Sequence, residues 1–502
     1  MQLSAELVAN AVYDAIRKCA TTLRPDFEAG VRAALEREEN PRARRVLDQM
    51  LENAHIARTD GVPLCQDTGT VWVCLEVGED LAVPGNVFSL VDDAVARAYD
   101  DGILRKSVLA DALLNRVNTN TNTPAFCEIK LVPGMGARLH VMLKGGGSDN
   151  ASRVIMLPPG AGREGIVREV LACVREKAAN ACPPLLVGIG IGATFDKVAG
   201  LAKHALLRPV GSPAASPEAA AFEAELLTEI NALGIGPAAL GGHVTALAVH
   251  VETAPCHIAA LPLAINMGCC AMRSASIDLV ERAAGSTSAS HSEEIAESTR
   301  SAAAPRTAAS RSAKPGLSTS SQDAEPLRLT LPLAAEDLAG LTAGQEVLMS
   351  GPVYTMRDAG HARALDYLRE RDELPFNLAG QTLFYAGPTP AAAGRPLGSV
   401  GPTTASRMDF ATPALMDAGI VACIGKGKRA PEVIEACKRN GSIYLATVGG
   451  VAALLATRVT DSELVAWEDL GTEALRRLNL HDFPAYVAID AQGRDLYREI
   501  EG

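Results

Sequence analysis

The chain has 502 residues, of which 48% are apolar and 21% are charged, and its formal net charge is -12. The length predicts two or more domains, and the acidic balance argues against non-specific binding to nucleic acids or anionic membranes. The 11 cysteines form no CxxC pair, and an odd number in so long a chain argues against a secreted disulfide scaffold. We therefore expect a cytoplasmic protein with reduced thiols.

The N-terminal part predicts a mixed α and β domain that is rich in helix. Apolar residues at three- and four-residue spacing predict helices over 5–19, 26–37, 41–57, 163–181 and 217–233. Strand-like runs occupy 71–77, 127–132, 138–143 and 243–251. The first helix lacks the pattern of a signal peptide, and no apolar run is long enough to span a bilayer.

The segment 285–325 differs from the rest of the chain. Ser, Ala and Thr dominate it and large apolar residues are almost absent, so burial cannot offset the entropy of ordering it. We expect a flexible linker between an N-terminal domain, 1–284, and a smaller C-terminal domain, 326–502. Strand-like runs such as 420–425 and 441–447, with a helix at 357–371, predict that the second domain is compact and α/β.

Cys65, Cys182 and Cys269 each lie in a turn beside Pro or Gly. Free cysteine is often a small buried residue, and the wide separation of these three favours that interpretation on spacing alone. Their polar turns favour a different one, in which three thiolates hold an iron–sulfur cluster that keeps one iron open.

Glycine runs and cations form further candidate sites. GIGIG (188–192) and KGGGS (144–148) suit either close chain packing or the binding of an anion by backbone N–H groups. Arg105, Arg357, Arg407 and Lys426 suit the recognition of a small dicarboxylate, although a single arginine is more often a solvated surface residue. His257 is a candidate carboxylate donor, although a lone histidine is more often structural.

These motifs occur together in the order of a known family. PLCQDTGT, LRKSV, KGGGS, CPP-x₃-GIGIG and APCHIA resemble the alpha part of class I fumarate hydratases and L-tartrate dehydratases. GPVYTMRDAGHAR, FYAGPTP, GPTTASRMD and IGKG resemble the beta part. The resemblance covers nearly the whole chain and implies the fused form of these hydro-lyases, with a cluster-binding α+β domain followed by a smaller, swivelling β/β/α domain.

The resemblance implies a [4Fe–4S] cluster held by Cys65, Cys182 and Cys269, and a homodimer. It implies a tricarboxylic acid cycle activity, the reversible hydration of fumarate to (S)-malate. The substrate contacts that it implies are Gln66, Asp67, Arg105, Gly146, His257, Arg357, Thr403, Arg407 and Lys426.

The implied chemistry divides between the cluster and the side chains. The open iron would act as a Lewis acid on the malate hydroxyl, while Thr403 and Asp67 are the acid and base candidates. A threonine hydroxyl is a very weak base, so Thr403 needs cations such as Arg407 and Lys426 to stabilise its alkoxide. The arginines and His257 would clamp the carboxylates.

Some alternatives stay open. The family usually reads NTGDNTPA where this chain reads NTNTNTPA (118–125), which places Asn120 and Thr121 where Gly and Asp are expected. L-Tartrate dehydration and mesaconate hydration use the same parts, although a fused chain favours fumarate. An iron–sulfur redox sensor would have four protein ligands, and a purely structural protein would bind no cluster.

Overall fold

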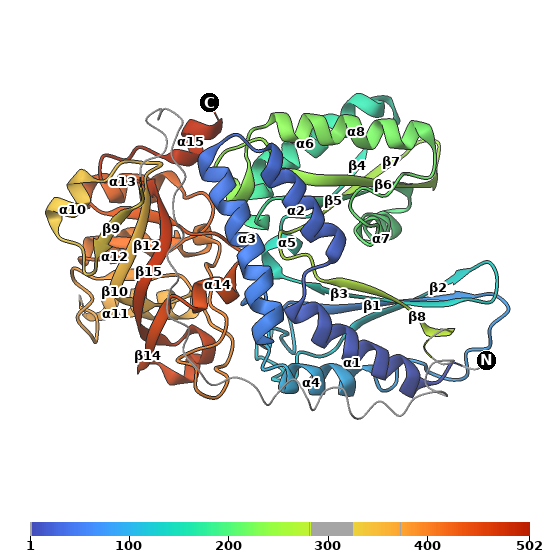
Figure 1. Cartoon of the computed structure of the whole chain (residues 1–502), viewed down its shortest axis with the longest axis horizontal. Helices are drawn as coiled ribbons and strands as arrows, with labels where there is room; N and C mark the ends of the chain where they lie inside the picture. Colours follow the sequence, from blue (N-terminus) through green and yellow to red (C-terminus); the bar gives the residue numbers. More distant parts are fainter. Residues whose placement is uncertain (1–2, 281, 283–324, 372, 502) are drawn as a thin grey trace, which may run out of the picture.

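The computed structural model describes residues 3–280, 282, 325–371 and 373–501, and it is a mixed α/β structure (Figure 1). The predicted linker, 285–325, lies outside the described residues except for Glu325. None of the described helices is long and apolar enough to cross a membrane.

Three helices open the chain close to where the sequence predicts them. They are α1 (Ala5–Thr21), α2 (Pro25–Arg37) and α3 (Pro41–Asp60). Ser4 caps α1 by accepting from the N–H of Leu7 at 3.2 Å, and the Asn40 side chain caps α3 in the same way. Gly61 ends α3 in the left-handed conformation, with φ of 65°. The chain then enters the PLCQDTGT turn.

The first sheet has the strand order β2-β1-β3-β8. Its strands are β1 (Thr70–Gly78), β2 (Phe126–Val132), β3 (Ala137–Lys144) and β8 (Ser274–Asp278). Alternate β1 residues such as Val71 and Val73 pack with α1 and α4 (Val91–Asp101) in one apolar core. The other face of β1 carries Trp72, Cys74 and Glu76. The predicted strand at 71–77 is confirmed.

The second sheet has the order β4-β7-β5-β6. Its strands are β4 (Arg153–Leu157), β5 (Leu185–Ala193), β6 (Ala246–Cys256) and β7 (Leu261–Gly268). The helices of this part are α5 (Gly146–Asp149), α6 (Gly162–Ala181), α7 (Phe195–Ala205) and α8 (Pro217–Ala232). In Figure 1, α7 lies between the second sheet and the first.

The GIGIG run is part of strand β5 and is not an anion-binding loop. A Cβ added at Gly188 would lie 2.2 Å from the Ala202 carbonyl oxygen, and one at Gly190 would lie 2.4 Å from that of Val198. These glycines therefore let α7 pack directly on the strand. The close-packing interpretation is confirmed, and the anion-binding interpretation of this run is wrong.

The C-terminal part contains a sheet with the order β14-β15-β13-β12-β11-β10-β9, in which β15 also pairs with β10. The strands are β9 (Leu327–Thr330), β10 (Glu346–Thr355), β11 (Thr382–Phe384), β12 (Ala422–Gly425), β13 (Ile443–Ala446), β14 (Val459–Ala466) and β15 (Leu475–Ile489). The helices are α10 (Ala335–Gly340), α11 (Asp358–Arg371), α12 (Thr412–Asp417), α13 (Pro431–Asn440), α14 (Ala452–Ala456) and α15 (Leu496–Glu501). The α/β character predicted for this part is confirmed.

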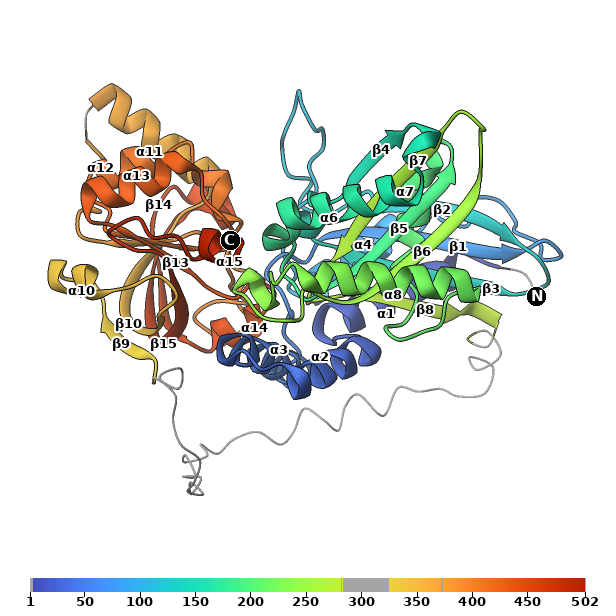
Figure 2. The ribbon, with the colours of Figure 1, turned by 90° about the horizontal axis from the view of Figure 1, so that it is seen from above.

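The two parts meet along α3 and α14 (Figure 2). One apolar core runs through both parts. The Asn53 side chain of α3 donates to the carbonyls of Leu64 and Gly450, at 3.1 and 3.3 Å. Ser399 donates to the Pro63 carbonyl at 2.6 Å, and the N–H of Ala452 donates to the Leu64 carbonyl at 3.2 Å. The C-terminal part therefore holds the PLCQDTGT turn in place.

Candidate active site

A cavity of about 240 Å³ lies where the two parts of the chain meet. The turns after α3, β3, α6 and β7 line it from the N-terminal part, and the loops after β10, β11 and β12 line it from the C-terminal part. The predicted site residues that line it are Cys65, Gln66, Asp67, Arg105, Gly146, Cys182, Cys269, Arg357, Thr403, Arg407 and Lys426. Turns distant in sequence thus converge on one space.

Three of the lining residues are cysteines, each placed by a different turn. Cys65 lies between α3 and β1, Cys269 follows β7, and Cys182 ends α6 in the left-handed conformation, with φ of 56°. A Cβ added at Gly449 would lie 2.4 Å from the Cys182 sulfur, so only glycine fits beside this thiol. Three thiols facing one cavity are the donor set for an iron–sulfur cluster that keeps one iron open.

A fourth cysteine lies close to these three but is used differently. The Cys270 thiol is buried and donates to the Gly449 carbonyl at 3.3 Å. Its own N–H donates to the Cys182 carbonyl at 2.9 Å, which fixes two of the cysteine turns together. Cys270 is not among the residues that line the cavity. The arrangement therefore offers three thiols and keeps the fourth in a structural hydrogen bond.

Arg273 is a cavity residue that the sequence analysis missed. It is buried, and its Nε and Nη1 atoms have no hydrogen-bond partner within the described part of the chain. Burial lowers the pKa of Arg273. Cys65, Cys269 and Asp67 raise it by more, so the net shift of the pKa is upward. A buried guanidinium with free donors among thiols is matched to an anionic group. Its place four residues after Cys269 is the signal that could have identified it.

Asp67 is held as a carboxylate. Its Oδ1 lies 3.2 Å from Arg105 Nη2, and its Oδ2 accepts from the N–H of Gly146 at 2.9 Å. Burial raises the pKa of Asp67, but Arg105, Arg273 and this N–H lower it more, so the net shift is downward. The ionised form is therefore the stable one. The second glycine of KGGGS thus points its N–H at Asp67.

Two arginines of the C-terminal part are oriented by carboxylates. Arg407 forms a bidentate pair with Asp358, at 2.9 and 2.6 Å, and Arg357 Nη2 lies 3.3 Å from Glu473. Burial, with Arg105 and Arg407 nearby, lowers the pKa of Arg357 to about 10. A bound anion would relieve this repulsion. The basic residues that line the cavity are Arg105, Lys177, Arg273, Arg357, Arg407 and Lys426, whereas Asp67 is the one acidic lining residue among those described.

Lys426 and Thr403 complete the C-terminal side. Lys426 Nζ lies 2.6 Å from the Cys182 sulfur and 3.2 Å from the Asn180 carbonyl. Burial lowers the pKa of Lys426, but Cys182 raises it more, so the ammonium form is favoured. The N–H of Thr403 donates to the Tyr385 carbonyl at 2.7 Å, and the N–H of Lys426 donates to the Thr403 carbonyl at 3.2 Å. These bonds fix Thr403 beside the lysine.

Gln66 is held by the C-terminal part, although it follows Cys65 in the chain. Its Nε2 donates to the Pro402 carbonyl at 3.3 Å, and its Oε1 accepts from the Cys65 thiol at 3.4 Å. A Cβ added at Gly401 would lie 2.5 Å from this Oε1 atom. Gly401 therefore leaves the space that Gln66 occupies.

His257 is the predicted site residue that lies outside the cavity. It is exposed in the connection between β6 and β7, and its Nδ1 accepts from the N–H of Ala259 at 3.0 Å. Cys269 follows the other end of β7, and a strand of that length spans about 26 Å. The chain therefore carries His257 away from its own cavity.

The NTNTNTPA segment supports the site from outside. Asn122 accepts from the N–H of Ser107 at 2.8 Å and donates to the Gly69 carbonyl at 3.1 Å. Asn118 donates to the Lys106 carbonyl at 2.9 Å. The segment thus braces both the Arg105 loop and the end of the PLCQDTGT turn. Asn120 and Thr121 do not line the cavity.

The chain matches two protein-family models. The model for fumarate hydratase (Fumerase) covers residues 9–278, and the model for the fumarase C-terminus covers 297–500. The anaerobic class I fumarate hydratase of Escherichia coli K12 is 29% identical over 522 residues, which cover 100% of this chain and 91% of that protein.

Two further relatives cover the chain to different extents. The mitochondrial fumarate hydratase 1 of Leishmania major is 29% identical over 90% of this chain and 82% of its own length. The putative L(+)-tartrate dehydratase subunit alpha of Methanocaldococcus jannaschii is 36% identical over 53% of this chain and 96% of its own length. The chain belongs to the class I fumarate hydratase family of hydro-lyases.

Proposed function

We propose that this protein catalyses the reversible hydration of fumarate to (S)-malate. The observation that carries the proposal is one cavity that combines three cysteine thiols, six basic side chains and a buried threonine hydroxyl. The fumarate hydratases similar to it extend over both parts of the chain, whereas the tartrate dehydratase relative is an alpha subunit that covers only the first. The substrate is a small dicarboxylate.

The thiols of Cys65, Cys182 and Cys269 would hold a [4Fe–4S] cluster. When bound, such a cluster supplies a Lewis acid that makes the hydroxyl of malate a better leaving group. Arg273 lowers the pKa of the Cys65 thiol and Lys426 lowers that of Cys182, although burial has the larger, opposite effect on both. Cys270, hydrogen-bonded to Gly449, stays out of the ligand set.

The basic residues bind and orient the substrate. Arg105 and Arg357 belong to opposite sides of the cavity, and their guanidinium groups suit the two carboxylates of one small molecule. Their protein partners, Asp67 and Glu473, fix the direction of each side chain before the substrate arrives. Gln66 adds an amide beside Cys65.

Thr403 and Asp67 move the protons. In dehydration Thr403 takes the proton from C3 of malate, and in hydration it returns it. The cations of Lys426 and Arg407 lower the cost of the alkoxide. Asp67, held ionised, is placed to accept a proton from water in the hydration direction and to return it to the leaving hydroxide in dehydration. Its lowered pKa makes its protonated form the stronger acid for that return.

The wider organisation follows the family. We propose a cluster-binding domain at 1–284 and a smaller domain at 326–502 that swivels against it, joined by the 285–325 linker. We further propose a cytoplasmic homodimer. Because His257 lies outside the cavity of its own chain, its substrate contact would be made in the site of the second copy.

The test is anaerobic reconstitution with iron and sulfide, followed by assays of fumarate, (S)-malate, L-tartrate and mesaconate side by side. Fumarate and malate turnover that disappears in air supports the proposal. Turnover chiefly of tartrate or mesaconate would leave the proposed roles of the cavity residues unchanged but would show that fumarate is not the main substrate. A bound cluster without turnover of any of the four would favour the redox-sensor alternative.

A further inference from the structure

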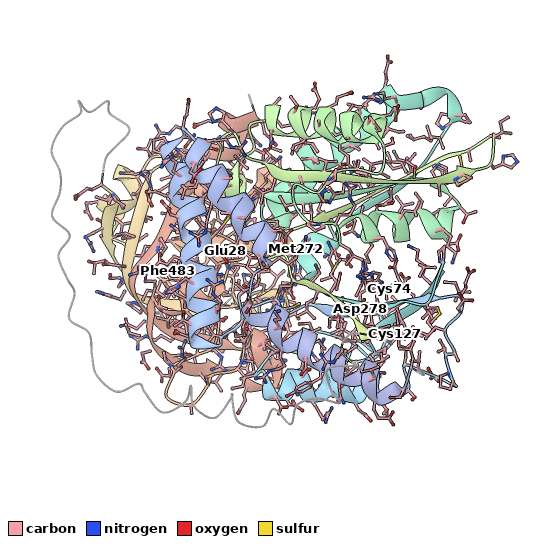
Figure 3. All side chains as sticks on the ribbon, turned by 45° about the vertical axis from the view of Figure 1, so that its right-hand side comes forward. Glu28, Cys74, Cys127, Met272, Asp278 and Phe483 are labelled. Carbon is pink, nitrogen blue, oxygen red and sulfur yellow. The ribbon has the colours of Figure 1, made fainter. Side chains whose placement is uncertain are left out.

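A second group of possible metal ligands lies outside the cavity, in the part of the chain that the structure describes. Cys74 of β1, Glu128 of β2 and His204 of α7 place their ligand atoms within 4.8 Å of one another. Cys74 is buried, and its neighbour Cys127 lies on the adjacent strand (Figure 3). None of the three residues lines the cavity.

The distances within this group match a tetrahedral metal site. The Cys74 sulfur lies 3.6 Å from His204 Nε2, which lies 3.1 Å from Glu128 Oε1. Zinc bonds of about 2.3 Å to sulfur and about 2.0–2.1 Å to nitrogen or oxygen, at tetrahedral angles, separate ligand atoms by roughly 3.3–3.6 Å. Small side-chain adjustments would therefore bring all three atoms onto one ion.

Glu128 is the hydrogen-bond partner of both other residues. Its carboxylate accepts from the Cys74 thiol and lies 3.1 Å from His204 Nε2, so the three ligand atoms already converge. Burial, followed by Glu128, raises the pKa of the Cys74 thiol to about 12. A divalent cation reverses that balance because it attracts both the thiolate and the carboxylate.

The group is accessible to solvent on the Glu128 side. The side chain of Glu128 is 45% exposed, so water reaches the group. The nearby His140 is already engaged, with Nδ1 at 2.7 Å from Ser276 and Nε2 at 3.3 Å from Glu76. The protein thus supplies three ligands and leaves the fourth position to water.

We propose that Cys74, Glu128 and His204 form a binding site for a borderline-soft divalent metal ion of the zinc type. Mixed sulfur, nitrogen and oxygen ligands are the set that Zn²⁺ accepts. The ion would join two strands of the first sheet to α7, which packs on the second sheet. Because β1 begins directly after the PLCQDTGT turn, the site ties the strand that follows Cys65 to the other layer.

The experiment uses protein already loaded with iron and sulfide, so that the cavity thiols are occupied. After exposure to zinc and gel filtration, we expect about one zinc per chain. X-ray absorption at the zinc edge should show one sulfur at about 2.3 Å with nitrogen and oxygen ligands. Several sulfurs per zinc, or no retained zinc in cluster-loaded protein, would overturn the site without bearing on fumarate turnover.

Variants locate the ion. Cys74→Ser and His204→Gln should each weaken zinc binding by at least about tenfold while iron content stays unchanged. Cys127→Ser is the matched control, because Cys127 pairs with Val73 and so faces away from Glu128. Equal zinc retention by all three variants would contradict the assignment. The absorption spectrum of the unmodified protein keeps the test valid if a variant fails to fold.

Discussion

The two sides of the cavity carry different chemistry. The N-terminal side supplies the three thiols and the one carboxylate, whereas the C-terminal side supplies Thr403, Arg357, Arg407 and Lys426. The thiols that would hold a metal cluster lie on one side only, whereas the groups proposed to bind the substrate and move its protons come from both sides. Neither part therefore contains a complete site by itself. Substitutions on the two sides should impair different properties, cluster binding on one side and turnover or substrate binding on the other.

The largest effect is expected on the thiol side. Cys65→Ser should abolish both cluster binding and turnover, because a hydroxyl is a poor replacement for a thiolate ligand of iron. Iron and sulfide content and visible absorbance measure the loss. Cys173→Ser is the control, since that buried thiol donates to the Ala151 carbonyl and lies outside the cavity. A Cys65→Ser protein that still binds a full cluster would contradict the proposal that Cys65 is a cluster ligand.

Thr403→Ala, on the opposite side, should leave the cluster intact. We expect kcat to fall by roughly 10²–10⁴-fold, because the group that exchanges the C3 proton is gone. Absorbance and iron content should match those of the unmodified protein, and Thr403→Ser should recover part of the rate. Near-normal kcat in Thr403→Ala would remove threonine from the proton path.

Arg357→Met should affect binding more than chemistry. Losing a charged hydrogen bond to a substrate carboxylate is expected to raise KM for malate by roughly 10–100-fold. Arg363→Met, in the helix that follows Arg357, is the matched control, because Arg363 pairs with the exposed Asp469 at 2.8 Å. Equal KM values in the two variants would argue against a carboxylate contact at Arg357.

Asp358→Asn should give the smallest effect. It weakens the bidentate pair that orients Arg407, but the guanidinium remains and is 45% exposed. We expect KM to rise by roughly 2–5-fold, with kcat nearly unchanged, because partly exposed ion pairs contribute little. A large loss of kcat would show that Asp358 does more than position Arg407.

The fold was partly predictable from the sequence. Apolar spacing located α1, α2, α3, α6 and α8, because each has a buried stripe at helical period. The GIGIG run was ambiguous, since glycine serves loops and close packing equally well. Only the placement of α7 against β5 decided between the two, and that helix was not predicted.

The site shows where local reasoning stops. Spacing could not connect Cys65, Cys182 and Cys269, because tertiary structure alone brings their turns together. The family motifs pointed to the residues that now line one cavity. Arg273 escaped notice because its one signal, a position four residues after Cys269, has meaning only once Cys269 is known to line the cavity. The position of His257 was not foreseen, because the strand β7 between His257 and Cys269 was not predicted. This strand places the two residues at opposite ends of the sheet.

The most direct test of the two-sided cavity is an anaerobic crystal structure of the reconstituted protein with (S)-malate. We predict a cluster on Cys65, Cys182 and Cys269, with malate against Arg105 and Arg357 and its C3 facing Thr403. A cluster that also binds Cys270, or malate bound outside this cavity, would contradict the account.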